Sequence, residues 1–213
     1  MFVRERMTPN PITIQANASI AEVTALMKEN KLKKVPVLNG TKLVGVVTDK
    51  DIDRVSPSGA TTLSVFEIGA LLAKTTVKDA MKPAITVTPD TYIEDVAIKM
   101  REARCNVVII TAEEKVVGII TESDMLDSFI AMLGGREEGN RYIIETDNKP
   151  GVLKDLGGTT SDLGINVSHF VFTQCTLDGK AELLVRTTKD GRVKEVSDAF
   201  NGLGFVVKDA CVK

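Results

Sequence analysis

The heptapeptide Gly45-Val46-Val47-Thr48-Asp49-Lys50-Asp51 has a counterpart later in the chain, Gly118-Ile119-Ile120-Thr121-Glu122-Ser123-Asp124. Each copy contains a glycine, two apolar residues, a threonine, two variable positions and an aspartate. The same offset relates residues upstream, since Ile20 corresponds to Ile93 and Met27 corresponds to Met100. An internal period of this length indicates two copies of one structural unit.

Each copy has the residue pattern of a β-α-β-β-α unit. In the first copy, a β-prone run at residues 12–14 precedes Ser19, the predicted N-cap of a helix that ends near residue 30. Strands at 35–38 and 43–47 flank the turn signal Asn39-Gly40, and a short helix begins near Asp49. The second copy predicts a strand at 85–87, a helix at 93–101, strands at 107–111 and 116–120, and a helix at 123–132. One such unit cannot easily bury its sheet alone, so we expect the two to pack face to face with pseudo-twofold symmetry.

The remaining segments complete a predicted α+β architecture. Residues 56–75 connect the copies, and their apolar residues predict a connecting helix: Leu63, Phe66, Leu71 and Leu72. After a glycine-rich linker at 134–140, the pattern changes to β-α-β-β-α-β, a ferredoxin-like order, with a hairpin around Asp178-Gly179. The predicted domains are therefore module 1 (1–55), the connecting segment (56–75), module 2 (76–133), the linker (134–140) and a C-terminal domain (141–213).

Composition narrows the classes of function. The 213 residues carry a net charge of −2, and 43% of them are hydrophobic. This composition is ordinary for a globular protein, and the charge argues against a protein that binds mainly nucleic acid. The three cysteines lack metal-ligand spacing and fit a reducing compartment. We see no signal peptide and no membrane-spanning run, and we expect a cytoplasmic protein.

The chain shows no recognised catalytic motif. It has no phosphate-binding loop of the Gly-x-x-x-x-Gly-Lys type and no dinucleotide fingerprint. His169 is its one histidine and stands in a predicted strand, where a structural role is more common than a catalytic one. We therefore expect neither an enzyme nor a metal site.

The doubled heptapeptide has two interpretations. Thr48 and Thr121 stand where a strand ends and a helix begins, and the unpaired N–H groups of a helix start attract phosphate. Asp51 and Asp124, one turn on, can accept hydrogen bonds from ribose hydroxyls. Thr13 and the backbone near residues 35–36 could line the base. The alternative is that Thr-x-x-Asp is a helix-capping box without a ligand.

The doubled module resembles a CBS-domain pair, the regulatory unit named after cystathionine β-synthase. Residues 1–133 carry the Gly-h-h-Thr-x-x-Asp motif of that family twice, and Val35-Pro36-Val37 matches its second strand. The resemblance implies a disc-like pair with two clefts for adenosine-type ligands such as AMP, ADP, ATP or S-adenosylmethionine. The implied nucleotide-binding residues are Ile12, Thr13, Lys34, Val35, Pro36, Thr48, Asp51, Ile85, Thr86, Val108, Ile109, Thr121 and Asp124.

The two copies differ in charge near the motif. Copy one has Lys33, Lys34, Lys50 and Arg54 where copy two has Asn106, Val107, Ser123 and Asp127. Because a polyphosphate needs compensating cations, this difference predicts that the motif of copy one serves a phosphorylated nucleotide. The alternative is that these basic residues form a solvated face.

The C-terminal domain resembles an ACT domain. Asp147-Asn148-Lys149-Pro150-Gly151-Val152-Leu153 is similar to the Asp-x-Pro-Gly-x-Leu signature, although here two residues separate Asp from Pro. The resemblance implies an amino-acid site where two such domains meet, with Asn148, Gly151, Val152 and Asn166 as candidates. The alternative is a dimerising sheet without a ligand.

A CBS pair followed by an ACT domain resembles the acetoin-utilisation B-type regulatory proteins. The predicted function is that of a non-catalytic sensor that binds an adenosine nucleotide and relays binding to a protein partner, with an amino acid at the ACT domain as a further candidate ligand. A homodimer is expected. The alternatives are a structural adaptor without a ligand and a nucleotide-processing enzyme.

Overall fold

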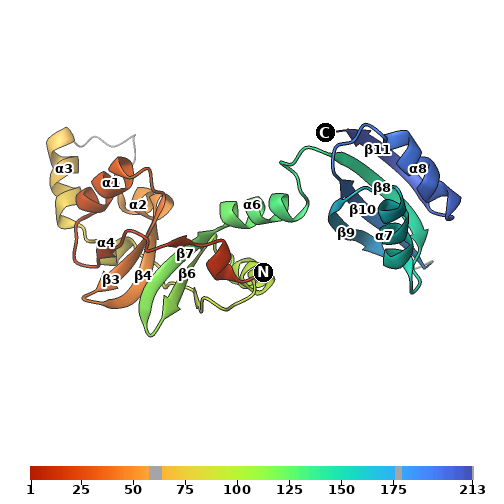
Figure 1. The fold of residues 1–213 in the computed structure, drawn as a ribbon. Coiled ribbons are helices and arrows are strands. Elements are labelled where there is room, and N and C mark those ends of the chain that lie inside the picture. Colours follow the sequence, from red (N-terminus) through yellow and green to blue (C-terminus); the bar gives the residue numbers. More distant parts are fainter. Residues whose placement is uncertain (58–63, 176–178, 213) are drawn as a thin grey trace. The chain divides into compact units, whose positions relative to one another are not determined.

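The computed structural model describes residues 1–57, 64–175 and 179–212, so the predicted positions Leu63 and Asp178 lie outside the described residues. The chain forms two compact units, residues 1–126 and residues 127–213 (Figure 1). Within the described residues, no helix is both long and apolar enough to cross a membrane.

The first copy of the repeat folds in the predicted β-α-β-β-α order. Its elements are β2 (Ile14–Gln15), α1 (Ile20–Glu29), β3 (Lys34–Asn39), β4 (Lys42–Thr48) and α2 (Asp49–Val55). β3 lies between β2, which is parallel to it, and β4, which is antiparallel. Ser19 caps α1 as predicted, because its Oγ accepts from the backbone N–H of Glu22. The first strand is Ile14–Gln15 rather than residues 12–14, because Ile14 is the first residue that pairs with β3.

The second copy repeats this order. It consists of β5 (Thr86–Val87), α5 (Ile93–Glu102), β6 (Val107–Ala112), β7 (Lys115–Thr121) and α6 (Glu122–Met132). Between the copies lie α3 (Val65–Lys74), the predicted connecting helix, and the short α4 (Val77–Ala80).

The segment that precedes each copy packs on the other copy. A 3-10 turn, η1 (Val3–Glu5), places Val3 in the core of the second copy, and β1 (Thr8–Pro9) pairs with β7. In the same way, Val77 and Ala80 belong to the core of the first copy. Residues 1–9, which the sequence grouped with module 1, therefore pack on module 2, and β1 extends its sheet.

This exchange explains the glycine of the doubled motif. The backbone N–H of Val46 donates to the Lys82 carbonyl at 2.9 Å, so the segment before copy two lies directly against β4. A Cβ on Gly45 would stand 2.6 Å from that carbonyl oxygen and 2.9 Å from the sulfur of Met81. A Cβ on Gly118 would overlap the sulfur of Met7 in the same manner. Close packing between the copies thus requires a glycine at position 45, where the obstruction is backbone, and favours one at position 118, where it is the end of a side chain.

Apolar residues form three clusters in this unit. Each copy has its own core between helix and sheet, with Val23, Met27 and Val35 in the first and the corresponding Val96, Met100 and Val108 in the second. A third cluster joins the two sheets and contains Val46, Val107, Ile109 and Ile119. This cluster agrees with the predicted face-to-face packing.

The second unit has the predicted β-α-β-β-α-β order. Its elements are β8 (Asn140–Asp147), α7 (Val152–Asp162), β9 (Val167–Cys175), β10 (Lys180–Thr187), α8 (Val193–Gly202) and β11 (Val206–Val212). The antiparallel sheet has the strand order β11-β8-β10-β9, and α7 and α8 cover one face (Figure 1). Tyr142, Ile144 and Leu183 point toward these helices. Because side chains alternate along a strand, Arg141, Ile143 and Leu184 point to the opposite face.

Candidate functional site

Thr48 and Asp51 form a complete capping box at the start of α2. The Thr48 Oγ1 accepts from the backbone N–H of Asp51 at 3.3 Å. In return, Asp51 Oδ2 accepts from the Thr48 N–H at 3.2 Å and from its hydroxyl at 2.7 Å. The hydrogen bonds of a capping box are therefore present in this copy, and both residues also line a cleft.

Asp51 is buried and paired with cations. It is 1% exposed, and its Oδ1 lies 2.7 Å from Lys82 Nζ and 3.5 Å from Arg54 Nη2. Burial alone would raise the pKa of Asp51, but the interactions with Lys82 and Thr48 outweigh it and lower the pKa below its usual value. Oδ2 of Asp51 therefore accepts hydrogen bonds from Thr48, whereas Oδ1 has cationic neighbours but no hydrogen bond among the described residues.

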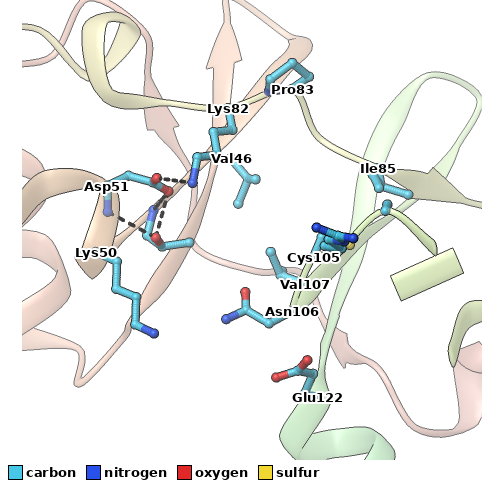
Figure 2. A pocket seen from close by; sticks show the side chains of 13 residues that line it. Val46, Lys50, Asp51, Lys82, Pro83, Ile85, Cys105, Asn106, Val107 and Glu122 are labelled. Carbon is cyan, nitrogen blue, oxygen red and sulfur yellow. Dashed lines mark hydrogen bonds and ion pairs between the residues drawn. The ribbon is translucent and has the colours of Figure 1, made fainter. Parts of the chain in front are cut away.

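The cleft at this motif, which we call the Asp51 cleft, has a volume of about 510 Å³ and takes its walls from both copies. Figure 2 shows Asp51 and Lys82 together, with Asn106 and Glu122 of the second copy across the opening. The wall contributed by copy two also includes Ile85 and Arg104.

The second motif forms a similar local structure. Asp124 Oδ2 accepts from the Thr121 N–H at 2.7 Å and from the Thr121 hydroxyl at 2.8 Å. Both residues are half-buried, whereas Asp51 is fully buried. The Asp124 carboxylate is thus more accessible from solvent than that of Asp51.

The cleft at the second motif, the Asp124 cleft, has a volume of about 420 Å³. Two of the basic residues that line it, Lys33 and Lys34, were expected from the sequence at the first motif. Lys31, Lys33 and Lys34 line it together with Thr121 and Asp124. Lys34 Nζ donates to the Asn106 carbonyl at 2.9 Å. Burial lowers the pKa of Lys34 from its ordinary value, although Glu122 and Asp124 oppose the shift.

Two of the four cations predicted for the first motif therefore line the other cleft. Lys33 and Lys34 belong to copy one in sequence, but they face the motif of copy two, because the segment that joins α1 to β3 reaches across to the other copy. Lys50 does line the Asp51 cleft, and Arg54 lies beside Asp51.

The structure distributes the predicted nucleotide residues over three environments. Thr48, Asp51 and Ile85 line the Asp51 cleft, and Ile12, Lys34, Thr121 and Asp124 line the Asp124 cleft. Val35, Pro36, Val108 and Ile109 are buried and line neither cleft, and Thr13 and Thr86 are likewise absent from both walls. Side-chain burial excludes Val35 and Val108 from ligand contact in this conformation, because both belong to module cores.

Sequence reasoning missed three basic residues of the clefts. Arg104 and Lys31 occupy corresponding positions after α5 and α1, and both have a left-handed backbone with φ of 50° and 55°. Lys82 precedes copy two and reaches the first motif. The sequence did offer a signal for two of them, because Arg104 and Lys31 are basic residues at matching positions of the repeat.

The four amino-acid candidates of the C-terminal unit differ in exposure. Asn148 and Asn166 are exposed, and Val152 is 4% exposed within the core. Gly151 has φ of +100°, and a Cβ there would meet no atom within 4 Å among the described residues. The backbone conformation alone therefore explains this glycine, and the core position of Val152 removes its side chain from any ligand.

Comparisons with known proteins agree with the fold of the first unit. The model of the CBS domain matches residues 3–58 and 77–131, and these two stretches comprise more than half of the chain. A putative acetoin utilisation protein (AcuB) from Vibrio cholerae has a similar structure, with a TM-score of 0.52 and 24% identity over 64% of this chain and 95% of that one.

Two similar structures were solved with ligands. The CBS-domain pair of protein MJ0100, in complex with 5′-methylthioadenosine and S-adenosyl-L-methionine, is 26% identical, has a TM-score of 0.51, and matches 64% of this chain and 98% of its own. CBSX2 in complex with AMP is 27% identical, has a TM-score of 0.50, and matches 62% and 97% respectively. The chain spans only about a third of the length of the first curated relatives that it matches.

Proposed function

Because the chain belongs to the CBS-domain family, we propose that its first unit binds adenosine-type ligands in the Asp51 and Asp124 clefts and acts as a regulatory module. The observation that carries this proposal is the double occurrence of a threonine and an aspartate at a helix start that opens into a cleft. The ligands of MJ0100 and CBSX2, which all contain adenosine, support the same class.

The Asp124 cleft is the better site for a phosphorylated nucleotide. Three lysines and one aspartate line it, and Thr121 supplies a hydroxyl at the start of α6. In this arrangement the lysines neutralise phosphate oxygens, and Asp124 accepts from the ribose. Its half-exposed position leaves room for this contact.

The Asp51 cleft suits a less anionic ligand. Three cations line it, as in the Asp124 cleft, but they share it with two carboxylates rather than one. Of these carboxylates, Asp51 is paired with Lys82, and Glu122 lies on the wall of copy two. A phosphate would meet repulsion from Glu122, whereas the positively charged methionine part of S-adenosylmethionine would be attracted by it. The charge difference thus assigns distinct ligands to the two clefts.

The second unit is proposed as an ACT-like module that supports a homodimer. The β-α-β-β-α-β order and the Pro150-Gly151 turn support this assignment, and the burial of Val152 in the core favours a dimerising role without a ligand. Relay of ligand binding to a protein partner, a cytoplasmic location and a role related to acetoin utilisation remain parts of the proposal, as does the absence of catalysis.

Thermal unfolding of the full chain tests the nucleotide proposal. AMP, ADP, ATP and S-adenosylmethionine are added separately at increasing concentrations, and a ligand at 100 times its Kd should stabilise the protein by about 2.7 kcal/mol. We expect AMP to raise the melting temperature of the native chain and of Asp51→Asn, but not of Asp124→Asn. No shift with any of the four ligands would favour a structural adaptor, and turnover of ATP would favour an enzyme.

A further inference from the structure

The C-terminal unit contains a cavity of about 540 Å³ on the sheet face that α7 and α8 leave uncovered. Phe129 and Leu133, in and just after α6, form one wall. Ile143 of β8 and Leu184 of β10 form part of the opposite wall. This volume and this mainly apolar lining are typical of small-molecule sites.

Two arginines are the charged side chains that line the cavity. Arg141 and Arg186 stand directly opposite each other on the paired strands β8 and β10. Like charges in this cross-strand position repel each other. Arg141 Nη2 donates to Asp209 at 3.0 Å, which leaves Arg186 as the cation without an acidic partner among the described residues.

Arg186 is buried without the partners that such burial requires. It is 6% exposed, and its Nε and Nη1 atoms have no hydrogen-bond partner in residues 1–57, 64–175 and 179–212; the same holds for Nε of Arg141. A guanidinium cannot lose its charge in a protein, so the unpaired cation is strongly unfavourable. Gly134 packs on this side chain, since a Cβ there would lie 3.0 Å from Arg186 Cδ. The strand β10 and the turn at Gly134 therefore hold Arg186 beside the cavity.

We propose that this cavity binds a small monocarboxylate with an apolar body, such as a short-chain alkanoate. The carboxylate oxygens accept from the Arg186 and Arg141 guanidinium groups, whose planar fork matches a carboxylate. The hydrocarbon chain lies against Phe129, Leu133 and Ile143. An α-amino group would be repelled by the two arginines, so the site differs in chemistry and position from the amino-acid site considered at the Pro150-Gly151 turn.

Binding of simple carboxylates to the full chain tests this proposal. Acetate, butyrate, hexanoate and octanoate are titrated by calorimetry, and 1-hexanol and 2-aminohexanoate serve as matched probes without the charge or with an added amine. We expect affinity to increase with chain length as apolar surface is buried, and we expect hexanoate to bind at least about tenfold more tightly than either matched probe.

Two variants and one control separate the carboxylate contact from the apolar contact. Arg186→Met should raise the Kd for hexanoate at least about tenfold and should melt no lower than the native protein, because it removes an unpaired buried charge. Phe129→Ala, at a side chain that is 58% exposed, should fold normally and weaken octanoate more than acetate. Arg136→Met is the control, since the Arg136 side chain is 73% exposed and its guanidinium pairs with Asp127.

The proposal is overturned if the native chain binds none of the four alkanoates. It is also overturned if Arg186→Met binds hexanoate as tightly as the native protein does. Should Arg186→Met fail to fold, equal affinities of Phe129→Ala and the native chain for octanoate would overturn it. The nucleotide assay is independent, because its clefts lie in residues 1–126 and this cavity lies in residues 127–213.

Discussion

Lys82 Nζ lies 2.7 Å from Oδ1 of Asp51, although Lys82 precedes the second copy of the repeat and Asp51 ends the motif of the first. The side chain of Asp51 is 2% exposed, whereas that of Lys82 is 58% exposed. The pair thus attaches the segment before copy two to the motif of copy one. It also occupies the carboxylate oxygen that a ligand would otherwise use.

Replacement of Lys82 by methionine should destabilise the first unit. The substitution leaves Asp51 buried with only Arg54, at 3.5 Å, as a cationic partner. Because Lys82 is largely solvated, we expect a loss of about 1–2 kcal/mol, which is less than the loss for a fully buried pair. Urea unfolding measures the change, with the exposed Lys42→Met as control. Equal unfolding midpoints for Lys82→Met and the control would contradict a structural role of the pair.

The lowered pKa of Asp51 predicts a loss of stability in acid. Burial raises this pKa, but Lys82 and Thr48 lower it by a larger amount, so the folded-state pKa lies below the unfolded-state value of about 3.9. The stabilisation is fully present above about pH 4 and is lost as the pH falls through the folded-state pKa. Urea unfolding between neutral pH and acid should therefore show a shallower acid decrease for Asp51→Asn than for the native chain. Identical pH profiles would show that Asp51 does not contribute to the acid transition.

Lys34→Met should reduce the affinity for AMP and leave the affinity for S-adenosylmethionine nearly unchanged. Lys34 lines the Asp124 cleft, and a charge-assisted hydrogen bond to phosphate contributes about 1.5–3 kcal/mol. We expect the Kd for AMP to rise at least about tenfold in calorimetry. Lys28→Met, at an exposed position of the same copy, is the matched control. An unchanged Kd for AMP in Lys34→Met would remove the assignment of phosphate to this cleft.

Gly151→Ala tests whether the turn before α7 serves the backbone alone. Gly151 has φ of +100°, so alanine should cost about 1–2 kcal/mol in strain, and asparagine should cost less. Since a Cβ would meet no described atom within 4 Å, no steric term adds to this strain. Thermal melting of both variants measures the difference. Equal melting temperatures for Gly151→Ala and the native protein would contradict the strain argument.

The repeat made much of the fold predictable, because matched positions such as Met27 and Met100 carry the same packing in both copies. The C-terminal order was equally readable, since Gly164 and Gly204 mark the ends of its helices with left-handed φ values. These features depend on local sequence and on hydrophobic period. These features can therefore be predicted without knowing which segments meet in space.

The sites were less predictable, because the repeat does not reveal which copy supplies each wall of a cleft. Lys33 and Lys34 belong to the same copy of the repeat as Asp51, but they line the Asp124 cleft. Val3 belongs to the core of the second copy, although it precedes the first copy in the sequence. Both outcomes arise from an exchange of segments between the copies, and such an exchange leaves no signal in hydrophobic spacing.

The contact between Gly118 and Met7 offers a direct test of this exchange. A Cβ at position 118 would overlap the Met7 sulfur, so Gly118→Ala should displace β1 from β7 and cost about 1–3 kcal/mol. The obstructing atoms belong to the flexible end of a side chain, so Met7→Ala should restore part of the loss, and the double variant should be more stable than the sum of the single effects predicts. At Gly45 the obstruction includes the Lys82 carbonyl oxygen at 2.6 Å, which no side-chain substitution removes. Met81→Ala should therefore rescue Gly45→Ala far less well. Urea unfolding of the two double-mutant cycles measures both couplings, and additive effects at Gly118 and Met7 would show that residues 1–9 do not pack on the second copy in solution.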